Sequence, residues 1–471
     1  MLYPLSYEGR CTVAAHGGAE EGQLHGSPRS AILTPMVATA VPAPSERPLA
    51  RHLLPDTARV GAGGRLSIGG VDLLDLVADV GTPVFVYDEE HLRARCREAV
   101  ASFPDGVAYA TKAFLCKAMA ALAVEEGMSL DVSTEGECRI ALAAGVDPSR
   151  LVLHGNNKSS AELTLPGPGG GRLGRIVVDS ADEIARLGAL PAHPAGRRPV
   201  LVRVTPGVEA HTHEYVMTGQ EDTKFGFSLA SGAADAAVAA LGRLEGVEVV
   251  GAHAHIGSQI FRLDAFAREM EALVPFVVRH GLGELCVGGG LGVAYLNAEE
   301  APTIAHWARS VRHAAAGAGL PADVRITAEP GRSIVATAGI TCYRVGTLKD
   351  LPGIRRYLAV DGGMSDNPRP VLYGSGYEAF LPRATDAERP LHVRVVGKHC
   401  ESGDVLAADA CLPADVAVGD VLATPVTGAY GYSMASNYNR LGRPPVVFVR
   451  DGTARVVVRR ETIEDLLRLE P

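Results

Sequence analysis

The sequence predicts a (β/α)₈ barrel combined with a second, all-β domain. Between about residues 107 and 331, eight short β-branched runs alternate with Ala- and Leu-rich stretches of helical period, and beyond about 335 the helical period fades. Eight βα repeats over about 225 residues are the size and rhythm of a closed barrel. An open doubly wound sheet would show the same alternation, and the pattern alone does not exclude it.

Each element of the barrel is expected from local composition. The segments 117–127 and 262–281 carry apolar residues at helical spacing. The expected strands are "VAYAT" (107–111), "SLDVST" (129–134), "LVLHG" (151–155), "IVVDS" (176–180), "VLVRVT" (200–205), "VVGAHAHIG" (249–257), "LCVGGG" (285–290) and "RITAEPG" (325–331).

The β domain is expected from strand-like runs punctuated by Gly, Pro and Asp. These runs are "TCYRVGTL", "RRYLAVDGG", "LHVRVVGKHC", "DVLATPVTGAY", "PPVVFVRDG" and "ARVVVRRE". The predicted organisation is an extension over 1–50, disordered or weakly ordered, a segment over 51–88 that contributes to the β domain, the barrel over 89–335 and the β domain over 336–471.

Bulk composition narrows the class of protein. Hydrophobic residues make up 47% of the 471 residues and charged residues 21%, which is ordinary for a globular enzyme. A net charge of -9 argues against a nucleic-acid partner, which would need a basic face. No apolar run approaches the roughly 18–20 residues of a membrane span. Eight irregularly spaced cysteines predict free thiols in a reducing compartment, hence the cytoplasm.

Polar residues stand where the strands of the barrel are expected to end, the place where barrels carry function. They are Lys112 after the first strand, His154 after the third, His255 at the sixth, Gly288–Gly290 after the seventh and Glu329 after the eighth. Alone, Lys112 would be an ordinary surface lysine. Its combination with glycines, histidine and glutamate at one barrel mouth predicts a site.

Two other interpretations of these motifs are weaker. His253 and His255 fall on one face of a strand, but no third ligand follows at zinc spacing, so no metal is expected. "GGGLG" does not match a dinucleotide loop because Val293 replaces the third glycine.

The combined set instead suits pyridoxal phosphate. An amine can bond to the cofactor aldehyde, a carboxylate can keep the ring nitrogen protonated, and bare glycine backbone together with Ser258 can bind phosphate.

From about residue 65 to its end, the sequence resembles the diaminopimelate decarboxylases, members of the fold-type III pyridoxal-phosphate enzymes. The resemblance rests on many motifs in order. They are "YATKAF" (109–114), "HGNNKS" (154–159), "GVEAHTHEY" (207–215), "KFGFS" (224–228), "HIGSQI" (255–260), "GGGLG" (288–292), "EPGRSIV" (329–335), "DGGMSDNPRPVLYG" (361–374), "CESGD" (400–404) and "GAYGYSMASNYN" (428–439).

The resemblance implies a role for each matching position. The residues expected at the cofactor are Lys112, which carries it, His255, which stacks on it, Glu329 at the ring nitrogen, and Gly257, Ser258, Gly288, Gly289, Gly290, Gly331, Arg332 and Tyr430 around it. The residues expected at the substrate are Arg332, Arg369, Tyr373, Glu401 and Tyr430. Guanidinium groups suit a distal carboxylate, which ornithine-type substrates lack, so Arg369 is the main discriminator of substrate.

Cys400 is the expected proton donor after CO₂ leaves. A thiol with an ordinary pKa of about 8.5 is mostly protonated at neutral pH, and its neighbours Glu401 and Asp404 favour that form. In the resembling family this cysteine comes from the partner subunit, so a homodimer with shared sites is expected.

The expected reaction is decarboxylation of meso-2,6-diaminopimelate at its D centre to L-lysine. The alternatives are a decarboxylase of the same mechanism that acts on a related amino acid, a racemase, and a non-catalytic cofactor-binding protein. Glu135 in "DVSTEGE" departs from the family, which has glycine there. It either faces the cofactor pocket or serves as a charge at a helix start.

Overall fold

The structure is a computed structural model that describes residues 46–167, 171–208 and 222–471. Residues 1–45 of the extension expected over 1–50 lie outside the described residues. Most of the motif at 207–215 also lies outside them. Residues 46–50 run against the folded chain: the backbone N–H of Ala50 donates to Oδ1 of Asn297 (2.8 Å), and Nε of Arg389 donates to the carbonyl of Arg47 (2.8 Å).

Eight parallel strands form the barrel, in an order that follows the chain from β5 to β13. A parallel bridge between Val107 and Ala328 joins the first strand to the last, and the N–H of Ala108 donates to the carbonyl of Ala328 (2.9 Å). The predicted barrel is therefore confirmed, and the open sheet is excluded. The strands are β5 (Ala108–Ala110), β6 (Ser129–Val132), β7 (Leu151–Leu153), β8 (Arg175–Val178), β9 (Arg198–Thr205), β11 (Val247–His253), β12 (Glu284–Cys286) and β13 (Arg325–Thr327), with the short β10 (Phe227–Ser228) beside β9.

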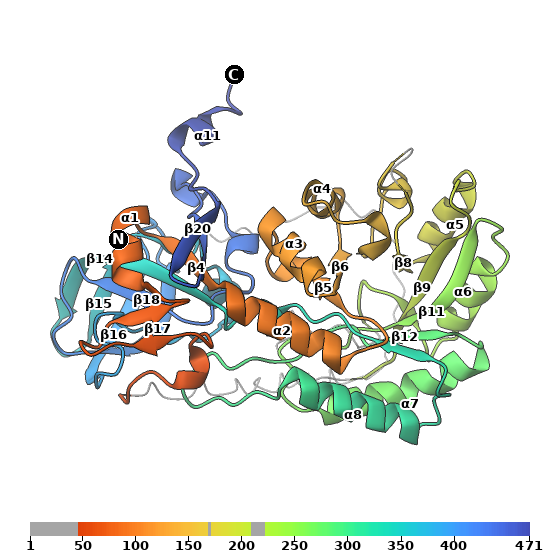
Figure 1. The fold of residues 1–471 in the computed structure, drawn as a ribbon, viewed down its shortest axis with the longest axis horizontal. Coiled ribbons are helices and arrows are strands. Elements are labelled where there is room, and N and C mark those ends of the chain that lie inside the picture. The colour runs from red at the N-terminus through yellow and green to blue at the C-terminus, as the bar shows by residue number, and fades with distance from the viewer. Residues whose placement is uncertain (1–45, 168–170, 209–221) are drawn as a thin grey trace, which may run out of the picture. The chain divides into compact units, whose positions relative to one another are not determined.

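Helices follow the strands around the barrel. Four of them, α2, α4, α5 and α8, are capped at their starts by short polar side chains, for example Asp88 before α2 and Thr134 before α4, which accept hydrogen bonds from the first turn. The last two long helices, α7 and α8, lie side by side (Figure 1). The helices are α2 (Glu89–Ser102), α3 (Lys117–Glu125), α4 (Glu135–Ala143), α5 (Ala181–Ala189), α6 (Ala233–Leu241), α7 (Asp264–Arg279), α8 (Ile304–Gly317) and the short α9 (Arg332–Val335).

The remaining strands form a mostly antiparallel sheet in the order β17-β16-β15-β14-β4-β19-β20, with β18 paired to β14. Figure 1 shows the early strand β4, in orange, among strands from the C-terminal part of the chain. The strands are β4 (Val84–Asp88), β14 (Gly339–Leu351), β15 (Arg355–Val360), β16 (Leu391–Val396), β17 (Val405–Leu412), β18 (Val421–Thr424), β19 (Val446–Arg450) and β20 (Thr453–Val458). Two short helices, α10 (Arg369–Tyr373) and α11 (Ile463–Leu467), belong to the same region.

A smaller unit precedes the barrel. It consists of β1 (Arg59–Val60), β2 (Leu66–Ile68), β3 (Val71–Asp72) and α1 (Leu73–Val80). Among the described residues, no helix is both long enough and apolar enough to cross a bilayer.

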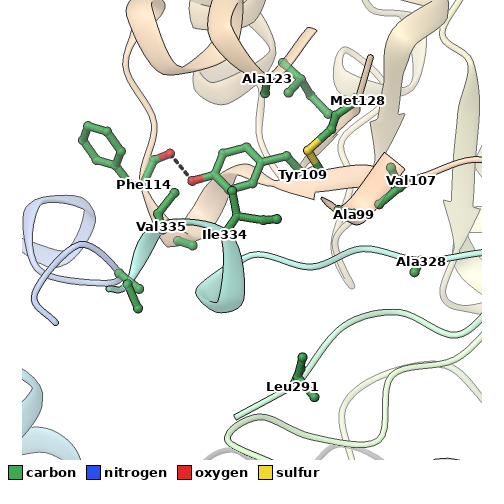
Figure 2. Packing of buried hydrophobic residues seen from close by; sticks show 14 of the residues in the cluster. Ala99, Val107, Tyr109, Phe114, Ala123, Met128, Leu291, Ala328, Ile334 and Val335 are labelled. Atoms are coloured by element: carbon green, nitrogen blue, oxygen red, sulfur yellow. Dashed lines mark hydrogen bonds between the residues drawn. The ribbon is translucent and has the colours of Figure 1, made fainter. Parts of the chain in front are cut away.

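The hydrophobic core holds the turn that bears Lys112. Figure 2 shows Tyr109, on β5, packed near Ile334 and Val335, with its hydroxyl donating to the carbonyl of Phe114 (2.6 Å). Tyr109 is fully buried, so this hydrogen bond is shielded from water. It closes the segment 109–114 and thereby fixes the position of Lys112.

Candidate active site

The strand ends of the barrel surround one cavity at its C-terminal mouth. Most of the residues predicted at the cofactor line it, and they come from β5, the loops after β11 and β12, the end of β13 and the β domain. The lining residues are Ala110, Lys112, Asp131, His154, Arg203, His253, His255, Ser258, Gly289, Gly290, Glu329, Gly331, Arg332 and Tyr430.

Lys112 lies in a single 3₁₀ turn, Thr111–Ala113, directly after β5. The hydroxyl of Thr111 donates to the carbonyl of Asp131 (2.7 Å), which ties this turn to the next strand. The side chain of Lys112 is exposed, because it points into the open cavity. The predicted position after the first strand is confirmed.

The predicted glycines let backbone segments meet around the cavity. A Cβ on Gly290 would lie 2.2 Å from the carbonyl oxygen of Gly257, and one on Gly289 would lie 2.3 Å from that of Glu329. A Cβ on Gly288 would lie 2.4 Å from the carbonyl oxygen of Ala254. No larger residue fits these positions, so the loops after β11 and β12 form a backbone-lined cradle. Gly257 and Gly288 belong to this cradle but do not line the cavity itself.

Glu329 is held between two histidines. Its Oε1 lies 2.9 Å from Nε2 of His154, and its Oε2 lies 2.8 Å from Nε2 of His253. The donor atoms of the three residues lie within 4.8 Å of one another, as a metal site would require, but the individual N–O distances are those of hydrogen bonds. Burial alone would raise the pKa of Glu329. The two histidines overcome this effect and hold its pKa well below the usual value, so the carboxylate is ionised.

The two histidines respond in opposite directions. Burial lowers the pKa of His253 to about 4, and Glu329 offsets only part of that effect. Burial also opposes protonation of His154, but Asp131 and Glu329 outweigh it and raise its pKa. Asp131 and Glu329 therefore favour the protonated form of His154.

His255 lies in the loop after β11, because that strand ends at His253. It was predicted on the strand itself, but it still lines the cavity. The N–H of Gly289 donates to its Nδ1 (3.3 Å). Burial, followed by the charges of Lys112 and Arg203, holds its pKa well below the usual value. His255 thus presents a neutral imidazole.

Sequence reasoning missed Asp131 and Arg203. Burial raises the pKa of Asp131, against the influence of His154. Arg203 is buried, with Nη1 3.5 Å from Oδ2 of Asp179. Both residues interrupt otherwise apolar strands, "SLDV" and "RPVLVRVT". A charge inside a buried parallel strand is a readable signal, since buried strands are otherwise nearly continuous apolar runs.

Arg332 and Arg369 both contact Tyr295, the first at its hydroxyl and the second at its ring. Nη2 of Arg332 donates to the hydroxyl of Ser258 (2.8 Å), and its guanidinium lies over the ring of Tyr430 (4.8 Å). Arg369 starts α10, is buried and does not line the cavity. Tyr373 ends α10 and is half-buried. The predicted substrate residues are therefore only partly brought to the cavity of one chain.

Cys400 and Glu401 are exposed and lie away from this cavity. The N–H of Cys400 donates to Oδ1 of Asn439 (3.1 Å). Asp404 is buried, and its carboxylate accepts the N–H groups of Met364 (2.7 Å) and His399 (2.9 Å). Asp404 therefore holds the backbone of the loop that carries Cys400. The six other cysteines among the described residues are buried.

Glu135 is the first residue of α4, where its side chain pairs with Arg139 (2.6 Å). It is absent from the cavity lining. Of its two interpretations, the structure supports the charge at a helix start.

The residues present fit pyridoxal 5'-phosphate. The cavity lining combines the amine of Lys112, the ionised carboxylate of Glu329 and the neutral imidazole of His255, and a backbone cradle that no Cβ can enter adjoins Ser258. A closed (β/α)₈ barrel with this set at its mouth defines a pyridoxal-dependent enzyme of fold type III.

Comparison with known proteins places the chain more narrowly. The family model described as "Pyridoxal-dependent decarboxylase, pyridoxal binding domain" matches residues 89–336. Diaminopimelate decarboxylase of Mycobacterium tuberculosis (strain ATCC 25618 / H37Rv) is 46% identical over 428 residues, which cover 86% of this chain and 95% of that protein. The Bacillus subtilis (strain 168) enzyme of the same name is 44% identical over 435 residues, covering 88% and 97%.

Solved structures agree. The diaminopimelate decarboxylase of M. jannaschii, determined in complex with L-lysine, superposes with a TM-score of 0.81 at 32% identity and covers 88% of this chain and 98% of that one. The chain belongs to the diaminopimelate decarboxylase family.

Proposed function

We propose that this protein decarboxylates meso-2,6-diaminopimelate at its D centre, giving L-lysine and CO₂, the last step of lysine biosynthesis. Relatives of this name at 44–48% identity over most of the chain support the assignment. The observation that carries it is the buried Arg369, which contacts the same side chain, Tyr295, as Arg332 of the cavity. Two guanidinium groups suit a substrate with a second amino-acid end, whereas a diamine-forming relative has no distal carboxylate to bind.

Lys112 would hold the cofactor covalently through its amine. Pyridoxal phosphate, when bound, supplies an electron sink for the electron pair that CO₂ leaves behind. Glu329 would keep the ring nitrogen protonated, and the ionised state that His154 and His253 favour supports this role. The neutral imidazole of His255 suits the face of the ring.

The glycine cradle and Ser258 would bind the phosphate group of the cofactor. Gly288–Gly290 offer backbone at positions where side chains do not fit, and a Cβ on Gly331 would lie only 3.0 Å from that of Ala110. Gly257 contributes its carbonyl oxygen to the same cradle, and Arg332 fixes the hydroxyl of Ser258 (2.8 Å). Tyr430, which lies under the guanidinium of Arg332, borders both cofactor and substrate.

The substrate's far end is assigned to Arg332, Arg369 and Tyr373 for the carboxylate, and to Glu401 for the ammonium. Cys400 returns a proton to the carbon that lost CO₂. Because Cys400 and Glu401 lie outside the cavity of their own chain, we propose that they complete the site of a partner subunit, in a homodimer with two shared sites. The free cysteines support a cytoplasmic enzyme.

A substrate panel tests the function. Purified protein loaded with pyridoxal phosphate is assayed for CO₂ release from meso-, LL- and DD-diaminopimelate, lysine, ornithine and arginine. We expect turnover of the meso isomer far above all others, with L-lysine as product. If another amino acid is preferred, the protein is a decarboxylase of the same mechanism with that amino acid as its substrate. If no amino acid of the panel is turned over, the proposed decarboxylase function is wrong.

A further inference from the structure

The two arginines proposed to bind the distal carboxylate are connected through two tyrosines that have no role so far. We call Arg332, Tyr295, Arg369 and Tyr377 the tyrosine–arginine cluster. All four side chains are buried, with relative exposures of 8%, 4%, 4% and 2% in that order. In such a dry environment, hydrogen bonds and cation–π contacts are stronger than at a surface.

Tyr295 contacts both arginines at once. Its hydroxyl accepts a hydrogen bond from Nη1 of Arg332 (2.8 Å), and the guanidinium of Arg369 lies over its ring, 4.4 Å from the centroid. The hydroxyl thus holds one guanidinium, and the ring face holds the other. The distance between the two cations is set by the dimensions of a single side chain.

Tyr377 fixes the far side of Arg369. Nη1 of Arg369 donates to its hydroxyl (2.5 Å), and its ring packs edge-on against Tyr295, with 5.2 Å between centroids. Burial, which the charge of Arg369 opposes, raises the pKa of Tyr377 to about 12, so the phenol stays neutral at physiological pH.

The backbone around Tyr295 is also held. The N–H groups of Tyr295 (2.7 Å) and Leu296 (3.1 Å) both donate to Oε2 of Glu299. The N–H of Asn297 donates to Oε1 of Glu378 (3.0 Å), the neighbour of Tyr377. The loop after β12 is therefore tied to the segment that carries Tyr377, and the two tyrosines are held in register.

We propose that Tyr295 is a positioning residue that sets the spacing between Arg332 and Arg369 and thereby selects substrates by where their second carboxylate falls. This inference rests on the proposed function. A shorter or longer dicarboxylic amino acid would meet only one guanidinium at a time. Because Tyr295 acts on binding rather than on the reacting carbon, its loss should change KM far more than kcat.

A graded pair of substitutions tests the two contacts of Tyr295. Tyr295→Phe removes only the hydroxyl, and we expect KM for meso-diaminopimelate to rise about tenfold, the usual effect of one lost charge-assisted hydrogen bond, with kcat within about twofold. Tyr295→Leu also removes the ring under Arg369, and we expect a larger rise, on the order of a hundredfold. Cofactor absorbance and melting temperature are read in parallel.

The matched control is Tyr357→Phe, which removes the hydroxyl of a half-buried tyrosine on β15 whose ring contacts Arg355. We expect wild-type KM there. In an Arg332→Lys background, Tyr295→Phe should add little, because the guanidinium that its hydroxyl serves is already gone.

The outcomes separate the inference from the function on which it rests. Wild-type KM in Tyr295→Phe, or an equal and additive loss in the Arg332→Lys background, would overturn the positioning role and leave the reaction intact. A wild-type enzyme that does not release CO₂ from meso-diaminopimelate would overturn the reaction, and the inference with it.

Discussion

Two buried glutamates show at the level of single residues how partners decide the state of a carboxyl group. Glu329 has a histidine on each oxygen and is held ionised. Glu269, on α7, is fully buried, and neither of its oxygens has a hydrogen-bond partner among the described residues. Burial therefore raises its pKa well above the usual value. The first arrangement serves the site, whereas the second only costs stability.

We expect Glu269→Met to stabilise the protein by about 1–3 kcal/mol at neutral pH, because it removes an unsatisfied buried polar group without changing helix propensity. The gain should depend on pH. A carboxyl whose pKa is raised in the folded state destabilises that state increasingly as pH rises above the unfolded value of about 4.3. The melting temperature should therefore gain more at pH 8 than at pH 5.

Glu271→Met is the matched control, since Glu271 lies on the same helix but is exposed. It should leave the melting temperature nearly unchanged at both pH values. A loss of stability in Glu269→Met would mean that the carboxylate has a partner that the fold does not reveal.

Cys400 gives the prediction closest to the chemistry. Cys400→Ala keeps the backbone N–H that Asn439 accepts, so the loop should keep its shape. We expect kcat to fall by a factor of about 10²–10⁴, as for removal of a general acid, while cofactor absorbance and the mass of the assembled protein in solution stay unchanged. The measurement is steady-state CO₂ release. A variant that turns over at the wild-type rate would remove Cys400 from the proton transfer.

At the level of elements, a buried ion pair ties the segment that follows β7 to β8 and α5. Nζ of Lys158 bonds to the carbonyls of Gly155 (2.7 Å) and Val177 (2.6 Å) and to Glu183 (2.9 Å). Lys158 and Glu183 are exposed by only 2% and 0%. Because Gly155 directly follows His154, the same amine also supports the histidine that holds Glu329.

Lys158→Met should destabilise the protein by about 3–5 kcal/mol, because it leaves the carboxylate of Glu183 buried without its cation. Adding Glu183→Gln should recover part of this loss, since the amide is neutral and can still accept the N–H of Asp179 (3.3 Å). Melting temperatures of the two single variants and the double variant provide the comparison. Purely additive losses would contradict direct coupling of the pair.

The eight strands of the barrel were predictable because each is a short apolar run bounded by turn residues. The strand β17 was not, because "VLAADACL" contains two exposed positions in succession and its pairing with β16 shifts register twice. The helix α10 was hidden by its length of five residues and by a proline in its first turn. Neither β17 nor α10 shows enough periodicity of apolar residues to be predicted from the sequence.

Within the site, residues that directly follow strands could be predicted from the sequence, whereas contacts between segments distant in the sequence could not. Lys112, His255 and Glu329 stand at strand ends, which the barrel rule places together. Tyr295 and Tyr377 are 82 positions apart and meet through tertiary packing alone. No spacing in the sequence predicts that these two tyrosines are in contact.

At the level of the whole molecule, the residue proposed to hold the cofactor lies apart from the residues proposed to donate the proton and bind the substrate's ammonium group. The cavity at the barrel mouth carries Lys112, whereas Cys400 and Glu401 lie on an exposed loop of the β domain and do not line it. An enzyme that needs both sets in one place can obtain them by pairing two copies through a two-fold axis, so that each copy gives its loop to the other.

Mixing two inactive variants tests this arrangement directly. Lys112→Ala lacks the amine proposed to hold the cofactor and Cys400→Ala lacks the proposed proton donor, so neither variant alone should release CO₂ at an appreciable rate. If sites are shared, a mixed dimer contains one site with both groups intact. With random exchange of subunits half of the dimers are mixed, so activity should return to about a quarter of wild type. The measurement is CO₂ release after the variants are unfolded and refolded together. Activity that stays at the level of the separate variants would show that each chain supplies its own thiol, since within one chain neither variant can complement the other.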